Sequence, residues 1–479
     1  MSGRRLFLGG QYLSFVAVVN KEIARIAPIS RKSKLVPGRP GAVPNGYEVG
    51  PRPIKVIVEI EAATKEGWLT RFDELAGFVI TEEPVELEFE SEPGRFYMAE
   101  FEGEMQTREM NIYGQIELNF ICNDPYAYKA EKSFQFVNGA AAITIGGTVE
   151  SKPIYEIDVL EDITHLDVFT DEHYLRIGKP APIEEVVYQR TTLLLSDNLT
   201  SLANWSTAQE VDNGYIAGTM TATAGGLTAT NFGTAITPKK WQGPSVRRSL
   251  PEVVQNFQID VPVEMMNVSK ETGMIEVYLR DALGNTVAKI GIEDIWISLK
   301  RNQTKFQLGN VATRTVQHYR HADNPSAWNN FKGLLRIWRD GNRFRPYFAL
   351  VDSAGRHSWV SSKWMYTDFA DDYSAPIASI QLAIRKYPGS AGSEADMKIK
   401  GVKLWRLNDP AAGIPIMANA GAKIIIDTAK GVVLLNGEER EDLKDWFSDF
   451  FAIEPGTTTL LLQPFDKVSG KVKLRERLR

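Results

Sequence analysis

Residues 317–330 combine aromatic rings with polar groups in the way that a saccharide site requires. A sugar ring packs its apolar side on an exposed aromatic face, and its hydroxyls need amides, carboxylates or guanidinium groups nearby. The segment is polar and contains Pro325, so we expect it to form a loop. Its candidate carbohydrate-binding residues are Tyr319, Asp323, Trp328, Asn329 and Asn330.

A second candidate for the same chemistry is the pair of predicted strands at 343–350 and 357–366. The side chains that would face one groove there are Arg345, Tyr347, Trp359 and Trp364. Core packing is the alternative for each tryptophan of both sets, because large rings in a β-sandwich are mostly buried. Trp338 and Trp405 lie in strongly alternating strands, and we expect both in the core.

Catalytic patterns are weak in this sequence. Adjacent carboxylates occur at Glu82-Glu83, Asp371-Asp372 and Glu438-Glu439, but neighbours on a strand point to opposite faces and do not form a glycosidase pair. The sequence also has no nucleophile elbow, phosphate-binding loop or dinucleotide-binding glycine pattern in a suitable context. We therefore expect a protein that is not an enzyme and needs no cofactor.

The composition excludes several further classes. With 479 residues, 43% hydrophobic and 24% charged, the chain is long and apolar enough to fold into about three domains. A net charge of −5 gives no general attraction to nucleic acid. No apolar run reaches the ~20 residues of a membrane span, so we expect synthesis in the cytoplasm without membrane insertion. The five histidines lack zinc spacing, and the lone Cys122 is expected to be a buried apolar residue.

The distribution of tryptophan divides the chain. Residues 1–128 predict an α+β domain, with a strand at 55–61, a helix capped by Thr64 and ended by Gly77, and an extended Pro-rich, basic loop between 21 and 53. Residues 129–190 and 410–479 read only as strands. Residues 191–409 hold eight of the ten tryptophans and repeat short strands, as a separate β-sandwich does. The pattern therefore predicts that one β-sandwich is inserted into a loop of another.

Several motifs outside 191–409 resemble those of siphophage distal tail proteins. Three of them lie near the end of the chain, at 432–437, 446–456 and 472–478. Residues 122–128 resemble the segment that closes the N-terminal domain of that family, and 147–153 the start of its second domain. The likeness covers the chain outside the insert.

The resemblance implies a mainly β fold made of an N-terminal ring-forming belt domain (1–128) and a galectin-like β-sandwich (129–190 and 410–479). It also implies six copies in a ring at the distal end of the phage tail, with the tail tube protein above and tail-associated lysin, fibre or receptor-binding proteins below. The galectin-like label describes a fold and does not imply sugar binding. The Pro-rich loop would then be either mobile or ordered against a neighbouring subunit.

The insert resembles the jelly-roll carbohydrate-binding modules of larger family members, through residues 196–205 and 395–405. That resemblance implies a structural calcium, for which Asp197 and Asp396 are the matching carboxylates. A capping or solvated role is the alternative for both.

We therefore predict a virion structural hub whose insert binds the cell-wall polysaccharide of a Gram-positive host. Two alternatives stay open: a modular cell-wall glycoside hydrolase or its accessory subunit, and a purely architectural hub whose insert docks another tail protein.

Overall fold

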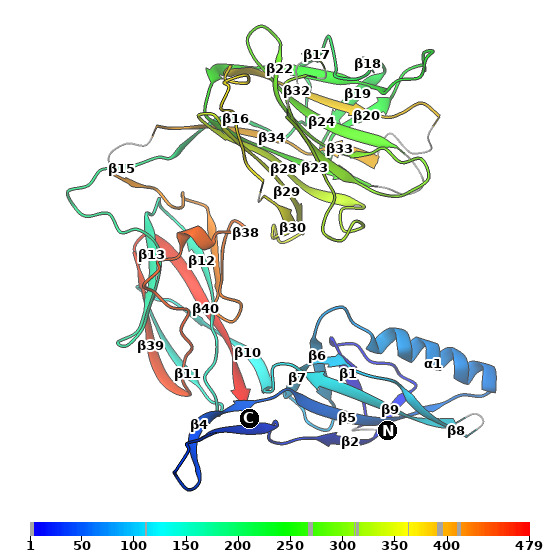
Figure 1. The fold of residues 1–479 in the computed structure, drawn as a ribbon, viewed down its shortest axis with the longest axis vertical. Helices are drawn as coiled ribbons and strands as arrows, with labels where there is room; N and C mark the ends of the chain where they lie inside the picture. The colour runs from blue at the N-terminus through cyan, green and yellow to red at the C-terminus, as the bar shows by residue number, and fades with distance from the viewer. Residues whose placement is uncertain are drawn as a thin grey trace. The chain divides into compact units, whose positions relative to one another are not determined.

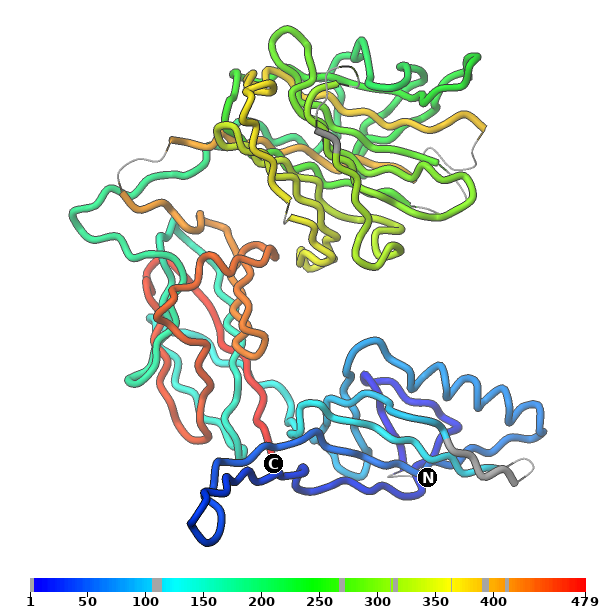
Figure 2. Tube along the Cα trace, viewed as in Figure 1, coloured from blue at the N-terminus to red at the C-terminus, as the bar shows by residue number. Residues whose placement is uncertain are grey.

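The computed structural model describes residues 4–110, 113–266, 272–310, 312, 316–362, 364–389, 396–409 and 413–479. The fold is mostly β, with 54% strand and 4% helix, which confirms the predicted fold class. The chain forms two compact units. The first comprises residues 1–178, 420–433 and 440–479, and the second comprises 179–419 and 434–439. Figure 2 follows the chain by colour from the first unit into the second and back.

The first unit contains a four-stranded sheet and most of a thirteen-stranded sheet, and Figure 1 labels most of their strands. The thirteen strands are β1 (Leu6–Leu8), β2 (Val16–Ile23), β5 (Arg52–Glu61), β6 (Val85–Phe89), β7 (Phe96–Phe101), β8 (Gln106–Met110), β9 (Tyr113–Cys122), β10 (Ala127–Gln135), β12 (Ile154–Val159), β36 (Lys423–Asp427), β37 (Val432–Leu435), β38 (Glu438–Glu439) and β40 (Val468–Leu478). The four-stranded sheet consists of β11 (Ala140–Ile145), β39 (Gly456–Gln463), β13 (His165–Phe169) and β14 (Tyr174–Gly178).

Strand β5 shows how the sequence sets this core. Its apolar residues at every second position, from Ile54 to Ile60, are fully buried, while the residues between them are not. A strand with period-two alternation buries one face only. The buried face packs with Trp68 of the helix and with Cys122, which is buried as expected.

Helix α1 (Lys65–Val79) begins as predicted and ends later than predicted. The Thr64 hydroxyl accepts a hydrogen bond from the Gly67 amide at 3.1 Å, which is an N-cap. The helix continues past Gly77 to Val79, because Val79 is buried in the core and its packing outweighs the weak helix preference of glycine. The predicted end at Gly77 is therefore wrong.

The Pro-rich segment is a β-hairpin and not the extended loop that the sequence predicts. Strands β3 (Ile29–Leu35) and β4 (Ala42–Val49) pair with each other as a separate two-stranded sheet. Pro44 lies next to a shift in the pairing register, where a missing amide donor is tolerated. Nearly every residue of both strands is exposed.

Glu476 joins three segments of the first unit. Its carboxylate accepts hydrogen bonds from Lys129 at 2.8 Å, from Lys132 and from the Gly146 amide at 2.9 Å, and its side chain is 4% exposed. These three donors lower the pKa of Glu476 from 4.5 to about 2. Because the pKa of the folded state lies below the ordinary value, the ionised carboxylate stabilises the fold above pH 4.5, and this contribution is lost as pH falls toward 2.

We expect Glu476→Gln to lower the free energy of unfolding by about 2 kcal/mol at pH 7, after allowance for screening of the half-exposed lysines. The difference between wild type and variant should shrink as pH falls toward 2. Denaturant unfolding across this pH range measures it, and a difference that does not change with pH would contradict the assignment.

The second unit is a sandwich of two large sheets. The ten-stranded sheet contains β16 (Thr191–Asp197), β19 (Thr219–Thr223), β20 (Gly226–Asn231), β23 (Phe257–Met265), β28 (Phe331–Asp340), β29 (Arg343–Val351), β30 (His357–Ser361), β31 (Tyr366–Thr367), β33 (Met397–Ile399) and β34 (Val402–Leu407). The seven-stranded sheet contains β17 (Ser206–Thr207), β22 (Ser245–Val254), β24 (Gly273–Arg280), β25 (Thr286–Asp294), β26 (Gln303–Leu308), β27 (Val316–Arg320) and β32 (Ile377–Arg385).

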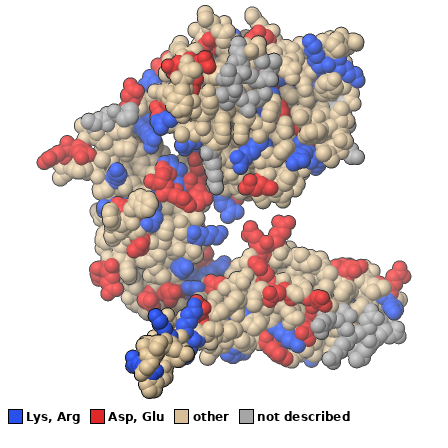
Figure 3. All heavy atoms as spheres, in the orientation of Figure 1, with Lys and Arg blue, Asp and Glu red and all other residues tan. Residues whose placement is uncertain are grey.

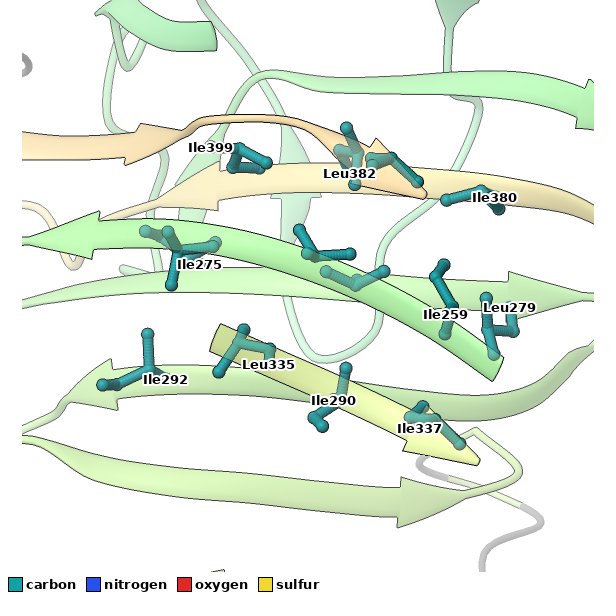
Figure 4. Close-up of a cluster of buried hydrophobic side chains, with 14 of the residues drawn as sticks. Ile259, Ile275, Leu279, Ile290, Ile292, Leu335, Ile337, Ile380, Leu382 and Ile399 are labelled. Carbon is teal, nitrogen blue, oxygen red and sulfur yellow. The ribbon is translucent and has the colours of Figure 1, made fainter. Parts of the chain in front are cut away.

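The core of this unit lies between the two sheets. Figure 4 shows Ile259 and Ile337 of one sheet facing Leu279 and Ile290 of the other, and all four are fully buried. Two short parallel pairs complete the unit: β15 (Val187–Tyr188) with β35 (Ile414–Pro415), and β18 (Tyr215–Ile216) with β21 (Gln242–Gly243).

The first and last strands of the proposed insert are neighbours. Strand β16 pairs with β34 along most of its length, and the Asn408 amide donates to the Arg190 carbonyl at 3.0 Å. The chain thus enters and leaves this sandwich at adjacent positions, which is the geometry that an inserted domain needs. The division of the remaining chain at residue 128 stays a prediction.

Candidate functional site

Trp328 does not offer its ring to solvent. It is 1% exposed and packs against Phe331 and Phe348, and its indole N–H donates to the Trp359 carbonyl at 3.2 Å. The prediction of Trp328 as a sugar-stacking residue is therefore wrong. The Trp328 side chain points inward because burying its large apolar ring in the core of the second unit is favourable.

The other predicted residues of this loop have mixed positions. Asn329 holds the loop together, donating to the Lys300 carbonyl at 2.9 Å and accepting from the Asn302 amide at 3.1 Å. Tyr319 is 47% exposed, and the Lys305 ammonium lies 5.5 Å from its ring centre. Asp323 and Asn330 are exposed. Tyr319 lies in strand β27 and not in the predicted loop, which comprises only 321–330, and it is the exposed aromatic ring of the segment 317–330.

The second predicted set does not form one groove. Tyr347 is 6% exposed, and its hydroxyl lies 2.6 Å from Nδ1 of His357. Trp364 stacks on His318 with ring centres 4.8 Å apart and packs against the core. Trp359 is 49% exposed and Arg345 is also exposed. Only the last two therefore remain available to a ligand.

Trp338 and Trp405 lie on the outer face of the ten-stranded sheet and not in the core, so that prediction is wrong. Both are partly exposed. In β28 the alternation buries Leu335 and Ile337, which leaves Trp338 on the opposite face. The strands do alternate as predicted, but the branched residues occupy the core positions and the tryptophans occupy the outer ones.

Asp197 and Asp396, the two residues predicted to bind calcium, both form hydrogen bonds within the protein. The Asp197 side chain accepts hydrogen bonds from the Leu199 amide at 2.8 Å and the Trp205 indole at 3.0 Å, and it pairs with Arg248. Asp396 accepts the Met266 amide through its main-chain carbonyl. Among the described residues, no three His, Cys, Asp or Glu side chains gather as metal ligands. Calcium at Asp197 and Asp396 stays a prediction.

A buried charge network on the seven-stranded sheet was not found from the sequence. Arg385 Nε donates to Glu276 Oε2 at 2.9 Å, and Lys289 lies 3.2 Å from Oε1 of the same carboxylate and 2.8 Å from Asp212. The Tyr278 hydroxyl donates to Glu276 at 2.8 Å. Glu276, Lys289 and Arg385 are each at most 1% exposed, so no charge in this group is screened by water.

Electrostatics keep this network ionised. Burial by itself raises the pKa of Glu276, but the charges of Arg385, Lys289 and Lys305 outweigh it and hold the pKa below the ordinary value. The network also holds residues 212 and 213, because Lys289 pairs with Asp212 and Arg385 donates to the Asn213 carbonyl at 3.3 Å. The sequence does contain a pattern that indicates this network. In β24, the polar residues Glu276, Tyr278 and Arg280 alternate with apolar ones.

Two exposed features occur in the first unit. The β3–β4 hairpin presents Leu35 at 77% and Tyr47 at 55% exposure, and Figure 3 shows its blue Lys and Arg side chains at the surface. Trp446 and Phe447 are 96% and 87% exposed. The Phe447 amide donates to Asp445 Oδ1 at 2.8 Å, which orders the backbone beneath these rings. Exposed apolar groups of this size are typical of interaction surfaces.

Comparison with known proteins gives two family matches and several solved structures. Residues 14–122 match the family described as phage tail protein RIFT-related domain, and residues 398–477 match the siphovirus-type tail component, C-terminal domain. No curated protein matches. In the described part of the chain, no helix is long and apolar enough to cross a membrane.

Similar solved structures share low sequence identity with this chain. The Dit protein of phage SPP1 is 18% identical, with 36% of this chain and 74% of that chain covered and a TM-score of 0.33. The CBM2 module of the evolved Dit of Lactobacillus casei BL23 phage J-1 is 14% identical, with coverage of 47% and 99% and a TM-score of 0.39. A legume lectin-like domain from Entamoeba histolytica is 13% identical, with coverage of 45% and 97% and a TM-score of 0.29.

Proposed function

We propose that this chain, which carries the two domains of a siphophage distal tail protein, is the structural hub at the distal end of a phage tail. The observation that carries the proposal is the order of the two matches, which lie near the start and at the end of the chain and have most of the second unit between them. The protein would be made in the host cytoplasm and act in the virion. Its partners would be the tail tube protein and the tail-associated lysin, fibre or receptor-binding proteins.

The β3–β4 hairpin supports assembly into a homo-hexameric ring. An isolated two-stranded hairpin is at best marginally stable in water, so a partner surface is expected to cover it. The hairpin is basic through Arg31, Lys32, Lys34 and Arg39, whereas acidic residues outnumber basic ones between 50 and 105. One subunit's hairpin would then lie on the acidic surface of the next, which is a head-to-tail contact that closes into a ring.

The inserted sandwich would bind cell-wall polysaccharide of a Gram-positive host. Its support is the concentration of tryptophan in 191–409 together with partly exposed rings on its surface. Single saccharide sites are weak, but several identical modules on one ring raise the effective concentration and strengthen attachment by ~10² or more. The mechanism is binding without hydrolysis.

Excising the insert tests both halves of this proposal. We expect a chain in which a short Gly-Ser linker replaces 191–409 to keep its ring and to lose binding to host cell walls, because the ends of the insert are adjacent in the structure. Sedimentation with purified walls measures the binding, and mass determination measures the ring.

The outcomes separate the alternatives. Wall binding that survives excision would contradict the role of the insert. Loss of a tail protein from the assembly without loss of wall binding would favour a purely architectural hub. Release of reducing sugar from the walls by the intact protein would favour a hydrolase.

A further inference from the structure

A row of five side chains crosses the outer face of the ten-stranded sheet. The pairing register places Leu193, Trp405, Gln258, Trp338 and Arg345 side by side on β16, β34, β23, β28 and β29. Residues directly opposite each other in antiparallel strands point to the same face. The neighbours of Gln258 along its strand, Phe257 and Ile259, are fully buried, so the row faces away from the core.

The two tryptophans are separated by one strand. Since neighbouring strands lie about 4.8 Å apart, the backbones that carry the two tryptophans are about 10 Å apart across the sheet, with Gln258 between them. Arg345 is exposed, and its guanidinium lies 5.6 Å from the centre of the Trp338 ring. The row thus alternates ring, amide, ring and guanidinium on rigid backbone.

This alternation fits a saccharide chain lying across the strands. The rings offer faces for the apolar sides of two sugar units. Nε2 of Gln258 donates one proton to Asp260 at 3.1 Å, so its second amide proton, its carbonyl oxygen and the Arg345 guanidinium offer donors and an acceptor for the hydroxyls. A protein partner would favour a continuous apolar patch, and the polar residues in this row interrupt one.

The next row of the same face is already occupied. Arg336 pairs with Asp260 at 2.7 Å and with Glu438 at 2.6 Å, and its guanidinium lies over the Tyr347 ring. These mutual contacts saturate the charged groups there. Unlike that neighbouring row, the tryptophan row combines partly exposed rings with polar groups.

We propose that Trp405, Gln258, Trp338 and Arg345 form a binding site for a neutral saccharide chain that runs perpendicular to the strands. The inference rests on the proposed saccharide binding by the insert and gives it a location. It also moves the site away from Tyr319 and Trp359, where the sequence places it.

The test uses the full-length protein and soluble polysaccharide fragments released from cell walls of the propagating strain. Trp338→Ala and Trp405→Ala are each expected to weaken binding at least about tenfold in calorimetric titration, and Trp338→Phe to retain part of the affinity. Trp296→Ala is the matched control, because Trp296 is 44% exposed on the loop after β25 and lies outside the row. Thermal unfolding checks that each variant is folded.

Three results would overturn the site. Folded alanine variants that bind as tightly as wild type would do so. A loss of binding in Trp359→Ala alone would also overturn this site, but it would not contradict the proposed saccharide binding by the insert. Failure of the wild-type protein to bind any fragment would remove the proposed adhesion function together with the site. Stronger binding to phosphate- or uronate-rich fractions would overturn the neutral ligand class.

Discussion

Replacing Glu276 by alanine is expected to lower the free energy of unfolding of the second unit by about 3 to 5 kcal/mol. Its carboxylate is 1% exposed and lies among Arg385, Lys289 and Lys305. Removing it leaves those cations in a site without water, and the penalty for an uncompensated buried charge exceeds the value of the original pairs. Denaturant unfolding followed by tryptophan fluorescence measures the loss, since eight of the ten tryptophans lie in 191–409.

Asp340→Ala provides the matched control. Asp340 forms a 3.2 Å ion pair with Arg343, but both side chains are about half exposed. Water screens such a pair, and its loss is expected to cost less than about 1 kcal/mol. Equal effects of the two substitutions would show that burial does not govern the Glu276 network.

Reversing the charges of the hairpin is expected to turn the ring into monomers. Arg31, Lys32, Lys34 and Arg39, each changed to Glu, would place a negative hairpin against the acidic surface that we propose as its partner. The strands contribute little to the core of their own subunit because they are exposed, so the monomer should stay folded. Light scattering measures the mass, and we expect a dissociation constant at least about 100-fold higher than that of wild type.

The control for this experiment reverses Lys332, Lys398, Lys400 and Lys403 of the second unit, which keeps the same change in net charge. That variant is expected to remain a ring. A ring that survives hairpin reversal, or a wild-type protein that is monomeric at micromolar concentration, would contradict assembly through the hairpin.

Period-two patterns predicted the strands well. The predicted strand at 55–61 lies within β5, and the helix starts at the capping Thr64, because both signals depend on neighbours in the chain. The motifs outside the insert also indicated a resemblance to siphophage distal tail proteins, which the matches to phage tail domains at 14–122 and 398–477 support. These motifs lie outside the aromatic-rich insert.

The candidate site was predicted less well. The composition of 317–330 indicated a loop, which is correct for 321–330 but wrong for 317–320, because these residues belong to β27. It did not show that Trp328 packs inward while Tyr319 faces solvent. The sequences of β28 and β34 alternate between two kinds of residue, but such a pattern does not show which of the two faces packs against the other sheet. Trp338 and Trp405 were therefore assigned to the wrong face.

The sequence by itself determined the mainly β fold and the resemblance to siphophage distal tail proteins, because these follow from local periodicity and short motifs. Only the tertiary structure decided which tryptophans are buried, that Glu276 is neutralised by Arg385 from another strand, and that Trp338 lies across one strand from Trp405. The physical reason is that β-pairing joins residues far apart in the chain. The register and the buried face are set by the free energy of the whole sandwich and not by any one strand.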